Sequence, residues 1–336
     1  MLPSAVLAFL FALGAYGIAC CAGFRLELSP AFAPSCLAVY AGTIIFWSLM
    51  YLAFLVVRED LRLKREERSN RSLLEVTRIV TEKFSIGRMV LELSVAIVLI
   101  HAVTVIHTNL QQRVPAVNPR VYDSAFARLD RGLGMGMDPV AGWARSSFLA
   151  VPTVARFFDL LYVSWYFVKL PLVTYFLLAS NRRKAQAFLF AFLLMWISHI
   201  LVVLVWPSLG PVFVSPEVFE SLNMPAARKI QEMVWRGYNE YLVSPEEYRV
   251  SMYEGMSAFP SLHVGLVALY ALFLAKSRTW VVWCAWIYVL LMLLGSCVTG
   301  WHYLADGVAG IGLAAGAWIL AQRLFLATER TRVSEP

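Results

Sequence analysis

Long apolar runs alternate with shorter polar segments along this chain. An apolar run of about 20 residues is long enough for an α-helix to cross a bilayer. The pattern therefore predicts an all-α polytopic membrane protein with eight spanning helices. They are expected at Ala5–Gly23, Pro34–Val57, Met89–Ile106, Phe157–Leu178, Ala185–Leu204, Pro260–Ala275, Val281–Cys297 and Ala305–Leu324.

Composition agrees with this prediction. Of the 336 residues, 60% are hydrophobic and 15% are charged, whereas a soluble domain carries about 25% charged residues. We expect lipid to cover much of the surface. The first apolar run could also be a signal peptide, because the residues from Ala19 to Gly23 are small enough for cleavage. No basic residue precedes the run, so we expect a retained span.

Basic residues give the chain a net charge of +7 and collect in a few segments. Nine Lys and Arg residues lie between Arg58 and Arg88, and others lie at Arg182–Lys184 and Lys276–Arg278. Alternating spans place these segments on one side, and short basic loops are typical of the cytoplasmic side. We therefore expect cytoplasmic N- and C-termini and no nucleic-acid partner.

The polar segments divide the chain into parts. The predicted parts are two N-terminal spans (1–57), a basic cytoplasmic segment (58–88), a six-helix catalytic core (89–325) and a cytoplasmic tail (326–336). Two long segments of the core, 107–152 and 206–258, fall on the non-cytoplasmic side, and a helix is expected at Pro225–Tyr241. We expect these outer segments to form the walls or lid of a site.

The first candidate motif is Phe259-Pro260-Ser261-Leu262-His263-Val264-Gly265, at the start of the sixth span. Proline suits the first turn of a helix. The free N–H groups and positive dipole end of that turn suit a phosphate. Ser261 adds a hydroxyl donor, and His263 adds an imidazole that can protonate a leaving oxygen.

The second motif is Trp301-His302-Tyr303-Leu304-Ala305-Asp306, where the chain enters the eighth span. His302 and Asp306 are four residues apart, so they share one face of a helix. A carboxylate that accepts the N–H of one ring nitrogen leaves the other nitrogen as a nucleophile. We therefore predict that His302 is the nucleophile and that Asp306 orients its ring.

Each motif alone is a weak signal, because a His-x-x-x-Asp pair is usually structural. Together they are more specific, since the sixth, seventh and eighth spans bring His263 and His302 to the same membrane face. Ionisable residues at membrane depth are functional by default. The five cysteines have no metal-type spacing and are expected to pack as small apolar residues. No metal or cofactor is expected.

On these residues the chain resembles the type 2 phosphatidic acid phosphatase superfamily. The closer likeness is to its branch of inositol phosphorylceramide synthases (inositolphosphotransferases) and related bacterial proteins, whose motifs resemble Phe-Pro-Ser-Leu-His and His-Tyr-x-x-Asp. The likeness covers roughly residues 130–324. The residues that match the two signatures are Pro260, Ser261, His263, His302 and Asp306.

The resemblance implies a six-helix catalytic fold and a mechanism without metal. His302 would attack the phosphorus and form a phosphohistidine, while Asp306 holds its ring. His263 would protonate the departing alkoxide and then deprotonate the acceptor. Ser261 and backbone amides would bind the non-bridging oxygens.

Two signatures of the family are altered in this chain. The phosphatases carry an arginine six residues before the third-signature histidine, where this chain has Ser296. The first signature, Lys-x6-Arg-Pro, is incomplete, because a glycine follows Lys229 and Arg236 in place of the proline. Lys229 and Arg236 are candidate phosphate ligands, although Arg113 and Arg120 have the same spacing in the other outer segment.

Lys169 lies inside the fourth predicted span and has two interpretations. A charged side chain is costly at membrane depth, so Lys169 could pair with a carboxylate or line the substrate path. It could also extend its ammonium group toward the inner surface. His101, His107 and His199 have no carboxylate in register, so we expect them to pack or to form interhelical hydrogen bonds.

The leading hypothesis is an enzyme that transfers a phosphate-containing head group. The donor would be a phospholipid or lipid phosphate, and the acceptor an inositol- or ceramide-like alcohol. The alternative is a lipid-phosphate phosphatase, in which water is the acceptor. A non-catalytic lipid-binding or transport protein is less favoured, because the set of His263, His302 and Asp306 is intact.

Overall fold

The computed structural model describes residues 2–23, 32–66, 72–83, 86–134, 138–179, 181–245 and 257–326. Every regular element in these ranges is a helix, which confirms the all-α prediction. The longer helices are α1 (Leu2–Cys21), α2 (Phe32–Glu66), α4 (Ile86–Gln112), α8 (Pro152–Val163), α9 (Trp165–Ala179), α10 (Arg182–Val205), α12 (Pro225–Val243), α13 (Leu262–Leu274), α14 (Thr279–Val298) and α15 (Leu304–Phe325). The shorter ones are α3 (Leu73–Lys83), α5 (Val114–Val117), α6 (Asp123–Leu133), α7 (Pro139–Ala144), α11 (Pro211–Val214) and η1 (Pro216–Val218).

The described chain has seven helical stretches long and apolar enough to cross a membrane. They are Leu2–Cys21, Leu37–Arg65, Met89–Gln112, Pro152–Leu178, Arg182–Val205, Thr279–Val298 and Leu304–Phe325. Each coincides with one of the eight predicted spans, and the remaining prediction coincides with the shorter apolar helix α13. The protein is therefore a multi-pass membrane protein.

Helix α13 is short because protein rather than lipid surrounds it. Its 13 residues extend about 20 Å, and every residue from Val264 to Ala271 is buried. A helix that is apolar on all sides belongs inside a bundle. Helices α10, α14 and α15 pack around α13, so the first histidine motif starts a helix at the centre of the molecule.

Several helix boundaries differ from the prediction, and α2 continues to Glu66 instead of ending at Val57. Helix α4 continues to Gln112 instead of ending at Ile106, so His107 lies within the helix. The fourth span breaks at Ser164, where α8 ends and α9 begins. The Ser164 hydroxyl donates to the carbonyl oxygen of Leu161 at 2.5 Å, and such bonds favour a bend in a helix. The predicted tail lies outside the described residues after Leu326.

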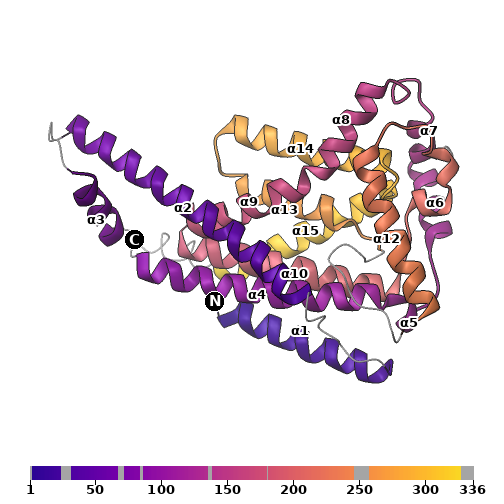
Figure 1. The fold of residues 1–336 in the computed structure, drawn as a ribbon, viewed down its shortest axis with the longest axis horizontal. Coiled ribbons are helices and arrows are strands. Elements are labelled where there is room, and N and C mark those ends of the chain that lie inside the picture. The colour runs from indigo at the N-terminus through magenta and orange to yellow at the C-terminus, as the bar shows by residue number, and fades with distance from the viewer. Residues whose placement is uncertain are drawn as a thin grey trace, which may run out of the picture.

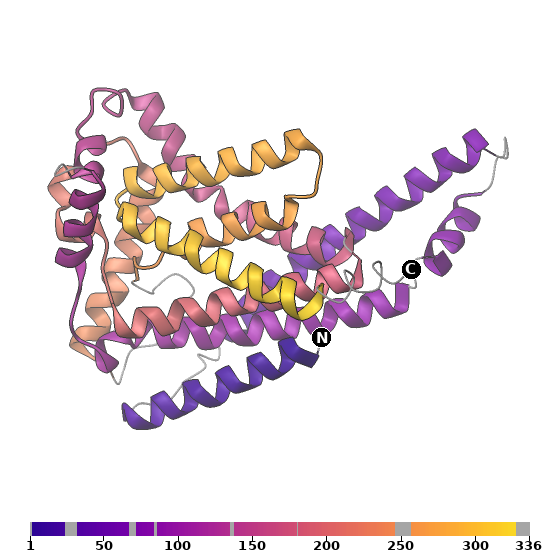
Figure 2. The same ribbon diagram turned by 180° about the vertical axis from the view of Figure 1, so that it is seen from behind.

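Short helices of the two outer segments form a layer across one end of the long helices. Figure 1 shows α6, α7 and α12 standing across the ends of the horizontal bundle. The view from behind shows the same layer and, at the opposite end, α2 projecting with α3 beside it (Figure 2). We call α5, α6, α7, α11, η1 and α12 the outer layer. Both histidine motifs open onto this end of the bundle.

Candidate active site

Helices α13 and α15 approach closely where each carries a glycine. A Cβ atom on Gly310 would lie 2.2 Å from the carbonyl oxygen of Ser261, and one on Gly265 would lie 2.8 Å from the carbonyl oxygen of Gly310. Real Cβ atoms do not approach backbone oxygen this closely. The two glycines therefore let the start of α13 lie against the first turns of α15, which brings the two motifs together.

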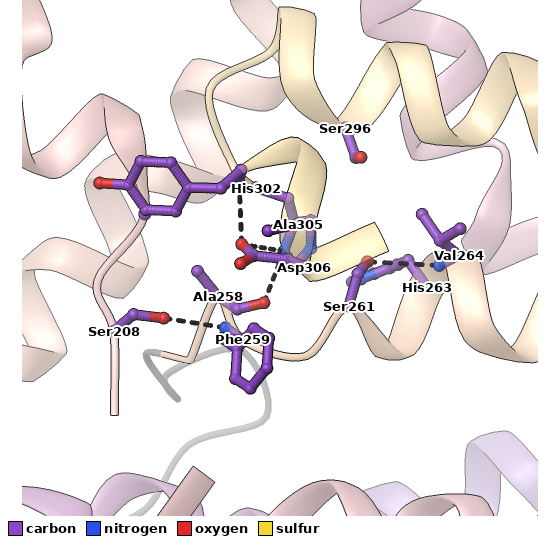
Figure 3. Close-up of polar contacts among 12 residues, drawn as sticks. Ser208, Ala258, Phe259, Ser261, His263, Val264, Ser296, His302, Ala305 and Asp306 are labelled. Carbon is purple, nitrogen blue, oxygen red and sulfur yellow. Dashed lines mark hydrogen bonds and ion pairs between the residues drawn. The ribbon is translucent and has the colours of Figure 1, made fainter. Parts of the chain in front are cut away.

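Two hydrogen bonds link the two motif segments, and Figure 3 shows the one between His302 and Ala258. The backbone N–H of Ser261 donates to the carbonyl oxygen of Asp306 at 2.8 Å. Nδ1 of His302 lies 2.7 Å from the carbonyl oxygen of Ala258, which precedes the first motif. These bonds fix the position of the His302 ring relative to the first turn of α13.

The bond to Ala258 sets the tautomer of His302. A carbonyl oxygen only accepts, so Nδ1 carries the proton and Nε2 keeps its lone pair. Oδ2 of Asp306 lies 3.5 Å from the same Nδ1 and accepts a hydrogen bond from the backbone N–H of Tyr303 at 2.8 Å. Asp306 therefore caps the start of α15 as well as facing His302, and a backbone carbonyl shares the orienting role expected of the carboxylate.

The two histidine rings face a shared space. Their centroids lie 6.1 Å apart. The hydroxyl of Tyr162 lies 3.2 Å from Nδ1 of His263 and 3.5 Å from Nε2 of His302. Tyr162 comes from the end of α8 and was missed by sequence reasoning, because it lies in an apolar run without a motif around it. His302 is 4% exposed and Asp306 is fully buried.

A family model described as the PAP2 superfamily matches residues 124–320, which is more than half of the chain. The chain belongs to the PAP2 superfamily. The matched residues contain the outer layer except α5 and the first residue of α6, both histidine motifs and most of α15. No curated protein and no solved structure matches the chain.

Membership of the PAP2 superfamily fixes the general chemistry. The chain is a membrane-embedded phosphatase or phosphotransferase that acts on lipid phosphates. Within the described residues, no group of three or more His, Cys, Asp or Glu side chains is arranged to hold a metal ion. The ionisable groups that gather at the two motifs are imidazoles and a carboxylate.

Buried aspartates of α6 tie the outer layer to the His302 turn. Asp130 accepts hydrogen bonds from the backbone N–H groups of Leu304 and Ala305, at 2.7 and 2.8 Å. These are orphan donors at the start of α15, which a carboxylate stabilises. Burial raises the pKa of Asp130, while the two N–H groups act in the opposite direction. Asp130 thus holds the start of α15 from outside.

Tyr303 joins the same network through Asp123. The Tyr303 hydroxyl donates to Oδ1 of Asp123 at 3.2 Å, and Asp123 also accepts from the backbone N–H groups of Leu209 and Gly210 at distances of 2.9 to 3.1 Å. Burial and the neighbouring Asp123 raise the pKa of the Tyr303 phenol. The hydroxyl therefore stays protonated and donates to Asp123. This bond holds Tyr303, the residue that follows His302, against the outer layer.

Ser261 is the N-cap of α13. Its Oγ accepts from the backbone N–H of Val264 at 3.3 Å, which leaves the hydroxyl proton available to a ligand. The Ser296 side chain bonds within its own helix, because its hydroxyl donates to the carbonyl oxygen of Leu293 at 2.8 Å. Its own carbonyl oxygen accepts from the backbone N–H groups of Trp301 and His302. Ser296 therefore shapes the turn that carries the second motif.

The structure does not bring the two candidate basic ligands to the histidines. Lys229 and Arg236 are both exposed on α12, and neither forms a hydrogen bond or ion pair with the motifs among the described residues. The buried face of α12 instead presents Gln231, whose amide donates to the carbonyl oxygen of Thr299 at 2.8 Å. Arg113, the alternative candidate, is buried, and its Nη1 donates to Oδ1 of Asn109 in α4 at 3.2 Å.

Proposed function

We propose that this PAP2-superfamily enzyme transfers a phosphate-containing head group through a phosphohistidine on His302. The observation that carries the proposal is the hydrogen bond from Nδ1 of His302 to Ala258, because it leaves the Nε2 lone pair free to attack phosphorus. Nε2 points toward the space shared with Tyr162 and His263. A nucleophile with a fixed tautomer and a second imidazole nearby is the arrangement that double displacement requires.

Each half-reaction forms one bond to phosphorus and breaks another. Nε2 of His302 forms a bond to phosphorus as the bond from phosphorus to the lipid oxygen breaks, and His263 gives the departing oxygen a proton. An acceptor hydroxyl then attacks phosphorus, its proton passes to His263, and the bond to His302 breaks. Ser261 and backbone N–H groups at the start of α13 bind the non-bridging oxygens.

We infer that the acceptor is an alcohol, as in the inositol phosphorylceramide synthase-like branch. The burial of His302 and Asp306 supports this inference, because a site that excludes water favours an organic acceptor over hydrolysis. Ser296 in place of the phosphatase arginine is the second support. The alternative is a lipid-phosphate phosphatase, in which water resolves the same intermediate.

We also propose that the site opens on the non-cytoplasmic side of a bacterial plasma membrane. The basic segments at Arg58–Arg88, Arg182–Lys184 and Lys276–Arg278 support this orientation, because basic residues mark the cytoplasmic side. They lie at the ends of spans remote from the outer layer. Both chain termini would then be cytoplasmic.

The test uses purified protein and a ³²P-labelled phospholipid pool. We expect acid-labile, alkali-stable label on the wild-type protein and none on His302→Ala, while His101→Ala, a histidine of α4 outside the motifs, keeps the label. Addition of an inositol- or ceramide-like alcohol should yield a labelled diester. Free phosphate as the sole product would favour the phosphatase, and full labelling of His302→Ala would remove the proposed nucleophile.

A further inference from the structure

One lysine inside the spanning part of the bundle has no carboxylate partner among the described residues. Lys169 lies in α9, on the stretch Pro152–Leu178, and it forms no ion pair with any carboxylate that the structure describes. A charged side chain at this depth is costly to insert and usually serves a function. The contacts of its ammonium group therefore indicate the function of this positive charge.

Three aromatic rings from three different helices surround the Lys169 ammonium. It lies 5.3 Å from the ring centroids of Tyr40 and Trp165 and 5.5 Å from that of Trp196. Nζ is also 3.4 Å from the Tyr40 hydroxyl. Ring faces stabilise a cation without neutralising it. The cage therefore fixes the position of the ammonium group and leaves its positive charge available to an anion.

The caged ammonium lies beside the histidine site. Trp165, which contacts Lys169, also packs edge-on against His263 with ring centroids 5.1 Å apart. Lys169 starts about 10 Å deeper along the helix than Tyr162, but a helical side chain leans toward the N-terminal turn, which brings the ammonium group back toward the site. The groups that act electrostatically on His263 are His302, Lys169 and His199, so Lys169 is the permanent cation among them.

We propose that Lys169 binds the anionic phosphate group of the lipid donor at the proposed phosphotransfer site. The bound phosphate carries negative charge throughout the reaction, and the described residues at the two motifs supply hydroxyl and N–H donors but no permanent cation. Lys169 supplies this permanent positive charge from the membrane side of the site. The proposal rests on the function proposed above and makes Tyr40 of α2, in the N-terminal helix pair, part of the wall of the site.

The experiment measures donor kinetics and inhibition by vanadate, used as a phosphate mimic, in Lys169→Met and Lys169→Arg. A charged hydrogen bond to phosphate is worth on the order of a tenfold to hundredfold change in binding. We expect Lys169→Met to raise KM for the donor and the vanadate inhibition constant by about that factor. Phosphohistidine should still form on Lys169→Met at saturating donor, and Lys169→Arg should keep most of the wild-type affinity.

Lys276→Met is the matched control, because this exposed lysine lies in the turn at the far end of α13. It should leave both constants unchanged. Wild-type constants in Lys169→Met would overturn the proposal, as would equal losses in the Met and Arg variants. Neutral variants (Met and Gln) that give no monodisperse protein while Arg does would show that the lysine serves folding, which also overturns it. Label on His302 separates these outcomes from failure of the proposed function, which would abolish labelling in the wild type.

Discussion

The carbonyl oxygen of Ala258 lies 2.7 Å from Nδ1 of His302, whereas Oδ2 of Asp306 lies 3.5 Å from the same nitrogen. A neutral backbone acceptor therefore holds the His302 tautomer, and the carboxylate adds negative charge beside the ring. In a serine-protease triad the carboxylate does both, and its amide variant loses about 10⁴ in rate because the ring adopts the wrong tautomer. The division of roles here predicts a different response.

We predict that Asp306→Asn lowers kcat by on the order of tenfold to a hundredfold, well below the loss of about 10⁴ seen in a triad. The asparagine carbonyl can still accept from the Tyr303 N–H, and Ala258 still holds the ring. The measurement is steady-state kcat with a thermal melt to verify folding. A folded Asp306→Asn protein that loses 10⁴ or more would mean that the Ala258 bond does not set the tautomer.

We predict that Tyr162→Phe lowers kcat by about tenfold, because it removes a hydroxyl 3.2 Å from His263 and 3.5 Å from His302. The phenyl ring keeps the stacking with Trp301, so the melting temperature should change little. Tyr288→Phe is the control, since its hydroxyl bonds to Ser164 at 2.8 Å. Equal rates in wild type and Tyr162→Phe would show that the hydroxyl has no part in the reaction.

We predict opposite effects for alanine at two glycines of α15. Gly310→Ala places a Cβ against the Ser261 carbonyl and should cost about 1–3 kcal/mol of stability with a loss of activity. Gly312→Ala adds a Cβ where nothing lies within 4 Å and should stabilise the helix by up to about 1 kcal/mol. Thermal melts and activity compare the two. Tolerance of Gly310→Ala would contradict the close approach of α13 and α15.

We predict that Tyr303 makes stability sensitive to alkaline pH. Its folded pKa is raised above the usual value near 10, so its stabilising contribution is complete below about pH 10 and is lost as pH rises further. Tyr303→Phe lacks this hydroxyl and its bond to Asp123. The melting-temperature advantage of wild type over Tyr303→Phe should be constant from about pH 8 to 9.5 and shrink above pH 10. If the melting-temperature advantage of wild type grew above pH 10, the folded pKa of Tyr303 would be lowered and not raised.

The sequence predicted the spans and the two motifs because both depend on local order along the chain. Apolar length identifies a span. His302 and Asp306 do lie side by side as predicted, but the predicted reason was wrong, because His302 lies in the turn before α15 and not on a helix face with Asp306. The short helix α13 still appeared as a span, since apolar length does not reveal whether lipid or protein surrounds a helix. The break at Ser164 was missed because a serine in an apolar run has several possible hydrogen-bond partners.

The groups that complete the site come from distant parts of the chain and carry no local signal. Tyr162 reaches the histidines from α8, and Ala258 contributes a backbone carbonyl that any residue type would provide. Lys229 and Arg236 stay a prediction, because their spacing fits a signature while the structure shows only that their side chains are exposed on α12. Spacing predicts which residues share a helix face, and tertiary packing decides where that face points.

The short length of α13 affects how a donor lipid reaches the histidines. Helix α14 has 20 residues and α13 has 13, and a tight turn joins them at one end. A 20-residue helix matches the thickness of the hydrocarbon core, so His263, about 10 Å short of the far end of α14, is expected below the plane of the lipid phosphates. The phosphorus must sink toward the acyl region, or the bilayer must thin locally. The fatty tails can stay immersed among their neighbours while the head group is exchanged above them.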